Sequence, residues 1–336
     1  MNRPVQLPQT SSAEAIPVDL QALLEQVRHY AGIAHKADIQ QLQPAMAKAY
    51  ALTGYPNGDD CAVLPAAQGY QLLAIEGFMN RFVEHDPWFA GWCGVMVNVS
   101  DIAAMGGKPV AVVNALWGQG AEQASLVMEG MAAASRAYQV PIVGGHTNLR
   151  SPQEQLSVAI LGQADALLSS FAARAGQDVV MAVDLRGNYQ RPFLNWNAAT
   201  SAPAERLRGD LALLPMLAEQ GLATAAKDIS QAGTLGTLIM LLECSGVGAE
   251  IELEAIPRPA GVDWQDWLCS FPSFGFLLSC APEHTAQVLA AFHQRDLAAA
   301  RIGHLRSAQE CWVSRGDQRA CFWNIARTPL TGMSSG

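Results

Sequence analysis

Acidic residues stand at several points of the chain where the neighbouring sequence is apolar. Five of them lie within two residues of Gly or Ser, at the ends of expected helices and strands: Asp59, Asp60, Glu76, Asp101 and Asp228. Carboxylate oxygens from several elements suit Mg²⁺, which usually also keeps water and binds substrate phosphates. Because an unpaired carboxylate is costly to bury, a shared metal ion would explain these acids. We therefore expect a Mg²⁺ site.

A simpler interpretation is available for each acid taken alone. Aspartate commonly caps helices and closes turns, and for any single acid we favour that interpretation. Four or five acids in otherwise apolar segments favour the metal site instead.

Several well-known catalytic motifs are missing from the sequence. It contains no GxxxxGK[ST] phosphate loop and no GxGxxG after a strand. It also lacks a GxSxG nucleophile turn and a HExxH zinc motif. The scattered acids are therefore the main candidates for chemistry.

The stretch 91–109, GWCGVMVNVSDIAAMGGKP, is expected to position one of these acids. Its apolar residues recur at helical spacing, which predicts a buried helix. Asn98 and Asp101 lie three residues apart and so share one edge of that helix. Gly106 and Gly107 end it.

Strands and helices alternate around this helix, which predicts an α/β or α+β fold. We place a domain boundary in the polar, Ala-rich segment 163–177. Before it, strands are expected at 70–79, 110–117, 141–148 and 156–164, with a tight Gly-Gly turn ending the third. After it, a long loop at 186–203 separates a strand at 178–185 from a helix at 205–220. Loops of that length are commonly functional.

Composition limits the kinds of partner. The 336 residues carry a formal net charge of -9 and no Lys/Arg run, which argues against a nucleic-acid surface. No apolar run approaches the length of a membrane span, and the N-terminus has no signal-peptide h-region. The seven cysteines form no CxxC pair, which favours reduced thiols and a cytoplasmic protein. We expect a small-molecule substrate.

Four segments resemble the ordered motifs of the AIR synthase superfamily: NGDDCAVLP, VNVSDIAAMGGKP, VGGHTN and KDISQAGTLGTLIMLLECSGVGAEI. This superfamily includes AIR synthase, FGAM synthase, selenophosphate synthetase and thiamine-monophosphate kinase. Its members use ATP and Mg²⁺ to phosphorylate an oxygen, sulfur or selenium centre. The sequence is most similar to the selenophosphate-synthetase-related branch, with thiamine-monophosphate kinase as a cousin.

The resemblance implies a two-domain chain whose N-terminal strands form a barrel at a homodimer interface. It implies an N-terminal domain at 19–165 and an α+β C-terminal domain at 170–328. Residues 1–18 and 329–336 are expected to be a flexible N-terminus and a loose tail. ATP and Mg²⁺ would lie in a cleft between the domains and subunits.

The resemblance also implies roles for individual residues. Asp60, Asp101 and Asp228 match metal-binding acids, with Asp59 beside them. Nucleotide contacts are implied for the following residues: Lys36, Glu76, Asn98, Gly144, Gly145, His146 and Thr147. His146 and Asp228 are the candidate catalytic residues. A structural role for His146 in a turn is equally compatible with the sequence. For Lys36, the sequence alone favours an ordinary exposed lysine.

The loop at 186–203 offers a candidate substrate contact. Arg186 and Arg191 could pair with an anionic group, Asn195 could donate to it, and Trp196 could stack on a ring. A plain surface loop explains the same residues almost as well.

Two departures from the family pattern leave two functions open. His146 and Gln231 stand where thiamine-phosphate kinases have acids. The selenium chemistry of the related synthetase would require a cysteine in an N-terminal loop, but no cysteine precedes Cys61. The first hypothesis is an ATP- and Mg²⁺-dependent phosphotransferase of unknown acceptor, with activity like either relative still possible. The second is a nucleotide-binding or regulatory homologue without turnover.

Overall fold

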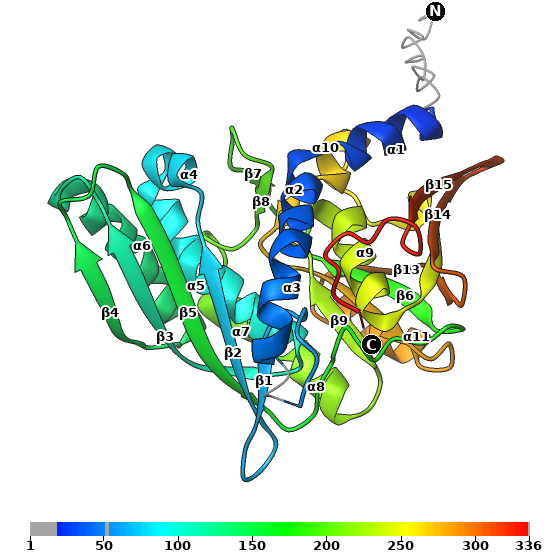
Figure 1. The fold of residues 1–336 in the computed structure, drawn as a ribbon, viewed down its shortest axis with the longest axis horizontal. Coiled ribbons are helices and arrows are strands. Elements are labelled where there is room, and N and C mark those ends of the chain that lie inside the picture. The colour runs from blue at the N-terminus through cyan, green and yellow to red at the C-terminus, as the bar shows by residue number, and fades with distance from the viewer. Residues whose placement is uncertain (1–18, 51–53, 335–336) are drawn as a thin grey trace, which may run out of the picture.

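The computed structural model describes residues 19–50 and 54–334. Two sheets with helices packed on them make up most of the molecule (Figure 1). This mixed arrangement confirms the α/β class expected from the alternating sequence pattern.

The N-terminal half contains a five-stranded sheet in the order β1-β2-β5-β3-β4. Neighbouring strands are antiparallel except for the parallel pair β3 and β4. The sheet is open within one chain, so the barrel that the family resemblance implies is not formed by a single copy. Its strands are β1 (Ala62–Pro65), β2 (Tyr70–Gly77), β3 (Lys108–Trp117), β4 (Ile142–Asn148) and β5 (Gln155–Ala164).

Helix α5 (Pro87–Ala104) lies between this sheet and the rest of the molecule and is buried from Phe89 to Ala104. Asp86 caps it by accepting a hydrogen bond from the Phe89 N–H at 3.2 Å. Helix α6 (Ala121–Tyr138) packs so closely on α5 that a Cβ on Gly91 would lie 1.9 Å from the Val127 carbonyl oxygen. The short helix α4 (Asn80–His85) precedes α5. The helix expected in 91–109 is therefore confirmed, with Asp101 in its last turn.

The C-terminal half contains a seven-stranded sheet in the order β15-β14-β10-β13-β6-β12-β9. Alternate residues of β6 enter two separate hydrophobic clusters, so helices cover both faces of this sheet. The strands are β6 (Asp178–Val183), β9 (Ala225–Asp228), β10 (Gly248–Glu252), β12 (Gly275–Cys280), β13 (Ala298–Arg306), β14 (Glu310–Arg315) and β15 (Gln318–Asn324). The helices are α7 (Ala204–Leu211), α8 (Leu213–Glu219), α9 (Gly233–Ser245), η2 (Leu253–Ala255), α10 (Trp264–Leu268) and α11 (Thr285–His293).

The expected loop at 186–203 carries regular structure. Strands β7 (Asn188–Tyr189) and β8 (Asn195–Asn197) join β11 (Phe271–Pro272) in a small three-stranded sheet. Backbone pairing with β11 fixes this segment, and that pairing is non-local, so periodicity along the sequence could not indicate it.

Four elements precede the first sheet: α1 (Leu20–Arg28), α2 (Ala31–Ala34), η1 (His35–Ala37) and α3 (Asp38–Tyr50). Helix α1 packs on β15 and α10, whereas α2 packs on α9. Figure 1 shows α3 standing between the two sheets. The expected flexible segment 1–18 lies outside the described residues.

The C-terminal segment differs from the loose tail expected at 329–336. The buried Glu243 carboxylate accepts hydrogen bonds from the Thr331 N–H and hydroxyl, both at 2.9 Å, and from the Gly332 N–H at 2.8 Å. These bonds anchor the chain as far as Met333, which is 8% exposed.

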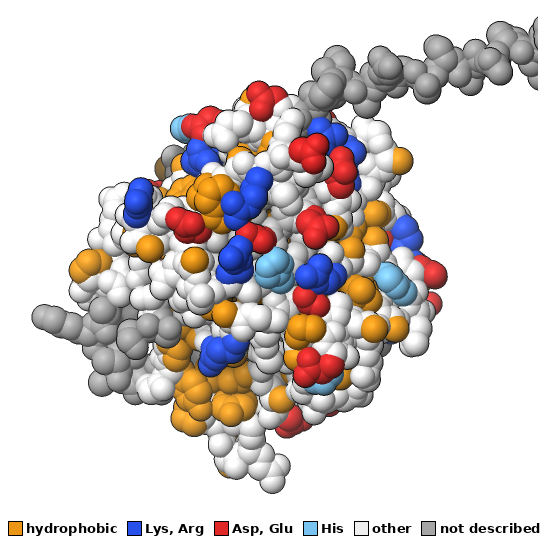
Figure 2. All heavy atoms as spheres, turned by 90° about the vertical axis from the view of Figure 1, so that its right-hand side faces the viewer, with side chains coloured by type: hydrophobic (Ala, Val, Ile, Leu, Met, Phe, Trp, Pro, Cys, Tyr) orange, Lys and Arg blue, Asp and Glu red, His pale blue; other side chains and the backbone are white. Residues whose placement is uncertain are grey.

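No helix of the described residues is long and apolar enough to cross a membrane. On the face shown in Figure 2, acidic and basic side chains are interspersed and form no large patch of one sign. That pattern agrees with the absence of a basic run in the sequence.

Candidate functional site

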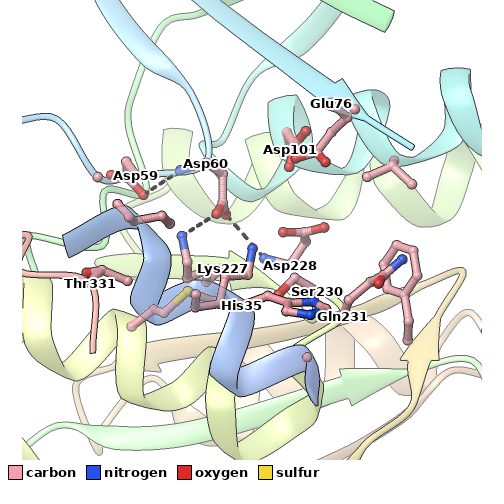
Figure 3. A pocket seen from close by; sticks show the side chains of 18 of the residues that line it. His35, Asp59, Asp60, Glu76, Asp101, Lys227, Asp228, Ser230, Gln231 and Thr331 are labelled. Carbon is pink, nitrogen blue, oxygen red and sulfur yellow. Dashed lines mark hydrogen bonds and ion pairs between the residues drawn. The ribbon is translucent and has the colours of Figure 1, made fainter. Parts of the chain in front are cut away.

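Three aspartates from three separate elements converge between the two halves of the chain (Figure 3). Asp60 precedes β1, Asp101 belongs to α5, and Asp228 ends β9. One ligand atom from each carboxylate lies within 4.8 Å of the others. Residues far apart in sequence are thus held at one point by the packing of α5 against β9.

The Asp101 carboxylate is 4% exposed, and its Oδ2 atom has no hydrogen-bond partner among the described residues. Asp60 is better satisfied, because its Oδ2 accepts a hydrogen bond from the Asp228 N–H at 3.3 Å. An unpaired buried oxygen beside two other carboxylates is costly unless a cation binds there.

Lys227 supplies one positive charge from within the protein. Its ammonium group forms an ion pair with Asp60, and its side chain is 5% exposed. Burial alone would lower the pKa of Lys227, but the carboxylates of Asp60 and Asp59 more than offset this and raise it above the usual value. Lys227 therefore stays protonated and ties β9 to the loop before β1.

The carboxylates of this cluster resist ionisation. Burial raises the pKa of Asp101 well above its usual range, and the charges of Asp228, Glu76 and Asp60 raise it further. Burial and the neighbouring Asp60 likewise raise the pKa of Asp228. Like charges held together in a desolvated site favour protonation unless a cation compensates them.

The cluster lies in a cleft of about 500 Å³ between the two halves of the chain. Glu76 reaches this cleft from β2, and Lys36 reaches it from η1. Burial raises the pKa of the Glu76 carboxyl, and the nearby Lys36 ammonium lowers it. The structure thus brings six of the predicted residues to one cavity: Lys36, Glu76, Asp59, Asp60, Asp101 and Asp228.

Asp59 borders the same cleft but has other partners. Its carboxylate accepts hydrogen bonds from the Ser169 hydroxyl at 2.7 Å and from the Ser170 N–H and hydroxyl at 2.9 and 2.6 Å. Both oxygens are therefore engaged in holding the segment that connects the two halves.

Other predicted nucleotide contacts lie elsewhere. Asn98 is fully buried on α5 and donates to the Gly94 carbonyl at 2.8 Å. The segment 144–147 lies on the exposed strand β4, and the structure does not place it in the cleft. Gly144 and Gly145 form no turn. A Cβ on Gly145 would lie 2.4 Å from Asn114 Oδ1 on β3, which explains the glycine at that position.

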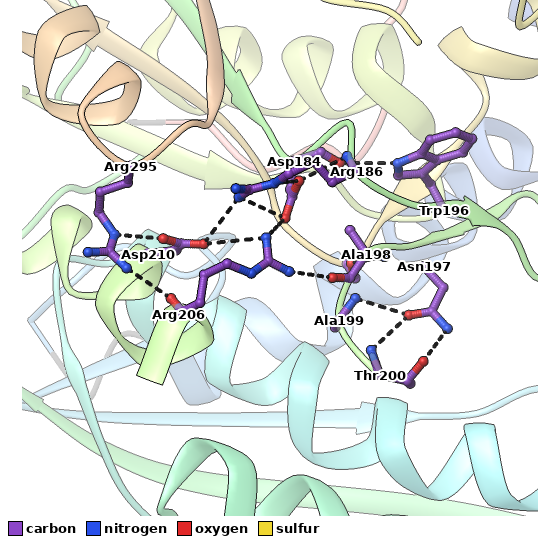
Figure 4. A network of polar contacts seen from close by, with 11 residues as sticks. Asp184, Arg186, Trp196, Asn197, Ala198, Ala199, Thr200, Arg206, Asp210 and Arg295 are labelled. Carbon is purple, nitrogen blue, oxygen red and sulfur yellow. Dashed lines mark hydrogen bonds and ion pairs between the residues drawn. The ribbon is translucent and has the colours of Figure 1, made fainter. Parts of the chain in front are cut away.

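The arginines of the loop at 186–203 point into ion pairs away from the cleft. Arg186 and Arg206 converge on Asp184, while Arg295 pairs with Asp210 (Figure 4). Arg191 pairs with Asp266 at 2.9 Å. The predicted role of Arg186 and Arg191 in substrate binding therefore has no support from their positions.

Trp196 and Asn195 follow in the same loop. Trp196 is 6% exposed, donates from Nε1 to the Asp184 carbonyl at 3.1 Å, and packs edge-on against Trp267. It is a core residue. Asn195 is also buried, and it borders a smaller cavity beside the cleft.

The cleft-lining residues that sequence reasoning missed include His35, Lys227, Thr331 and Met333. Lys227 immediately precedes Asp228 in a strand, so its neighbour was a usable signal. His35 likewise precedes Lys36. Nothing local indicates Thr331 and Met333, because the buried Glu243 brings them there from the end of the chain.

The donor set fits Mg²⁺. It consists of carboxylate oxygens only, one of which lacks a partner, and it opens onto a cleft large enough for phosphates and water. The described residues place no histidine or thiol within the trio, as a softer metal would favour.

Comparisons with known proteins agree with this two-part architecture. Residues 58–164 match the family described as AIR synthase related protein, N-terminal domain, and residues 193–312 match its C-terminal domain. Uncharacterized protein sll0787 of Synechocystis is 44% identical over 93% of this chain and 98% of its own. Thiamine-monophosphate kinase of Synechococcus elongatus is 27% identical over 73% of this chain and 86% of its own.

Solved structures share the fold at low sequence identity. Thermotoga maritima PurL complexed with ADP matches with a TM-score of 0.68 and 18% identity, over 93% of this chain and 54% of that one. AaThiL complexed with AMPPCP and TMP matches with a TM-score of 0.62 and 20% identity, over 82% and 94%. Because the two family models match residues 58–164 and 193–312, the chain belongs to the AIR synthase related protein family.

Proposed function

We propose that the protein is an ATP- and Mg²⁺-dependent phosphotransferase that activates a small-molecule acceptor. The observation that carries this proposal is the convergence of Asp60, Asp101 and Asp228 in a cleft between the two halves. Phosphoryl transfer needs positioning and charge neutralisation more than covalent chemistry from the protein, and a buried carboxylate trio supplies a place for the metal.

Related proteins support the proposal that the cleft binds ATP. Relatives include a selenide, water dikinase and a thiamine-monophosphate kinase, and structural neighbours were solved with ADP or AMPPCP. These names indicate a general ATP-using chemistry in the family. They do not specify the acceptor of this chain.

Different residues of the cleft would bind the metal, face the phosphates and accept a proton. Asp60, Asp101 and Asp228 would hold Mg²⁺, which when bound neutralises phosphate charge and polarises the transferred group. The ammonium groups of Lys36 and Lys227 would face the phosphates. His35 lies on the cleft wall and could accept the proton released by an acceptor hydroxyl.

We also propose that the protein is a homodimer. The face of the five-stranded sheet opposite α5 exposes apolar side chains from β2, β3, β4 and β5: Leu73, Ile75, Val113, Val143 and Leu161. A contiguous apolar face of this kind marks an interaction surface. Because β4 belongs to that face, His146 and its neighbours in the segment 144–147 would meet a nucleotide only through the second copy.

A second candidate is nucleotide binding without turnover. Lys227 already neutralises Asp60, which reduces the charge available for metal. A site that holds nucleotide with fewer metal ions could serve a regulatory role.

Metal-dependent release of ADP distinguishes the two candidates. The protein is incubated with ATP, Mg²⁺ and one of several acceptors, such as thiamine phosphate, selenide, formylglycinamidine ribonucleotide or small carboxylic acids. Acceptor-stimulated ADP release that Asp228→Asn abolishes supports the phosphotransferase. Nucleotide binding with no stimulated release by any acceptor favours the second candidate.

A further inference from the structure

A second cavity of about 190 Å³ adjoins the cleft. Five residues line both spaces: Gly32, His35, Met79, Gln231 and Phe271. Gln231 lies only three residues beyond Asp228, so the shared wall is close in sequence to the metal-binding trio. Figure 3 shows His35, Ser230 and Gln231 together on the Asp228 side of the cleft. The two spaces therefore meet near the carboxylates.

The walls of the second cavity are largely aromatic and apolar. Tyr30, Phe193 and Phe271 line it. The Phe193 ring packs edge-on against Phe82 with centroids 5.1 Å apart, so neighbouring core residues support its position. A flat, apolar ligand body suits such walls.

Arg81 gives the second cavity its charge. This side chain lines the second cavity but not the cleft, so it lies away from the shared wall. Its side chain contacts the Met79 sulfur at 3.8 Å and the Phe193 ring, whose centroid is 5.8 Å from Cζ. Within 19–50 and 54–334 it forms no ion pair with an acid, whereas Arg186 and Arg191 both do.

The charges of the two spaces are opposite. The described lining of the second cavity contains no acid, and His35, Asn195 and Gln231 add neutral polar groups. The cleft, in contrast, contains more acids than cations. Its cations are Lys36 and Lys227, and its acids are Asp59, Asp60, Glu76, Asp101 and Asp228. An anionic group would be repelled from the carboxylates unless metal is bound, but it would be attracted to Arg81.

We propose that the second cavity binds the phosphoryl acceptor, a compact molecule with a flat apolar body and one anionic group. The anion, a carboxylate or a phosphate, would pair with Arg81, and the opposite end would reach the cleft past His35 and Gln231. The volume is similar to the roughly 150 Å³ of a protein cavity that binds benzene, which suits a single ring rather than a second nucleotide. This inference rests on the proposed phosphotransferase function.

Binding of single-ring probes tests the proposal without turnover. Benzoate, phenyl phosphate, benzyl alcohol and benzylamine are titrated by ligand-observed NMR into the full chain with Mg²⁺ and a non-hydrolysable ATP analogue. We expect one or both anionic probes to bind, and the neutral and cationic probes to bind at least tenfold more weakly. Benzoate and phenyl phosphate then distinguish a carboxylate from a phosphate.

Three variants make the test specific. Arg81→Gln should weaken anion binding at least tenfold, Arg81→Lys should restore part of it, and Arg150→Gln, at another exposed arginine, should leave it unchanged. Arg81 is exposed, so these substitutions should fold normally. Equal anion binding by the wild type and Arg81→Gln, or preference for the neutral probe, would overturn the proposal.

A separate titration of the Mg²⁺–ATP analogue distinguishes failure of the acceptor site from failure of the proposed phosphotransferase function. It should be within twofold of wild type in Arg81→Gln. If the analogue does not bind to the wild type at all, the proposed function fails. If the analogue binds and the anions do not, only the acceptor site fails.

Discussion

At the scale of single residues, the site is a balance between buried acids and the cations that compensate them. Asp101 has an oxygen without a partner, Asp60 is paired with Lys227, and Glu76 lies near Lys36. The acids were predictable because each stands in an apolar segment, where burying a carboxylate is costly unless a partner compensates its charge. Lys227 was harder to predict, because its only local signal was the adjacent Asp228, and neighbouring residues of a strand ordinarily point to opposite faces.

Replacing Lys227 tests its role as an internal cation. Lys227→Met should lower the metal-free stability by about 3–5 kcal/mol, because it leaves the buried Asp60 carboxylate unpaired. The same variant should bind Mg²⁺ more tightly than wild type, since the trio becomes more negative. Thermal unfolding with and without Mg²⁺ measures both effects.

Lys108→Met is the matched control. Lys108 pairs with Glu219, but both side chains are exposed, at 56% and 40%. Its loss should change stability by less than about 1 kcal/mol and leave Mg²⁺ affinity unchanged. A Lys227→Met protein with lower Mg²⁺ affinity than wild type would contradict the internal-cation role.

The acids also predict a pH dependence. Because the pKa values of Asp101 and Asp228 are raised in the folded state, the native protein keeps protons that the unfolded chain has lost. The unfolding free energy of the metal-free protein should therefore fall as pH rises from about 4, the usual aspartate pKa. Mg²⁺ affinity should rise over the same window, because protons and metal compete for these carboxylates.

Denaturant titrations from about pH 5 to about pH 8, in EDTA and in Mg²⁺, check this prediction. Asp101→Asn should flatten the metal-free profile, since it removes one of the titrating groups. A metal-free protein whose stability rises steadily with pH across this range would be inconsistent with the buried trio.

At the scale of elements, local pattern predicted helices and strands better than it predicted their ends and partners. The periodic apolar residues of α5 identified that helix correctly, whereas β4 runs straight through Gly144 and Gly145, where a turn was expected. Strands β7 and β8 were missed because they are only two and three residues long, and because β8 also pairs with the distant β11. The anchored C-terminal segment was missed because its partner, Glu243, lies 88 residues away from Thr331.

Glu243→Gln tests the anchor of the C-terminal segment. Both carboxylate oxygens accept backbone N–H groups, so the amide would turn at least one of these contacts into a donor facing a donor. We expect a loss of about 1–3 kcal/mol in local stability, with faster amide exchange at Thr331 and Gly332. Because Thr331 and Met333 line the cleft, nucleotide affinity should also fall.

Hydrogen exchange read by mass spectrometry measures the loosening. The exposed Glu252→Gln, on β10, is the control and should leave exchange near the C-terminus unchanged. Unaltered protection at Thr331 in Glu243→Gln would show that other contacts hold the segment.

At the scale of the whole molecule, two halves build one site, and neither half contains all of it. The N-terminal half supplies Asp60 and Asp101, and the C-terminal half supplies Asp228 and Lys227. The two-part α/β class and the family were predictable from ordered motifs. The distance between the acids was not, because it depends on how α5 packs between the halves.

The exposed sheet face predicts how the molecule associates. Ile75 and Val143 are 70% and 64% exposed on that face, so we expect the wild type to be a dimer in solution. Ile75→Lys combined with Val143→Glu should give a monomer by light scattering after size exclusion. Leu126→Lys, at a 38% exposed residue on α6, should remain a dimer, and a monomeric wild type would contradict the proposal.

Calorimetric titration of a non-hydrolysable ATP analogue, with and without Mg²⁺, measures whether the carboxylate trio holds the metal of a nucleotide site. We expect Mg²⁺-dependent binding by the wild type, at least tenfold weaker binding by Asp101→Asn, and wild-type binding by Asp317→Asn, a control at an exposed turn. Tenfold corresponds to about 1.4 kcal/mol. Binding that does not require Mg²⁺, or equal affinity in wild type and Asp101→Asn, would contradict the account.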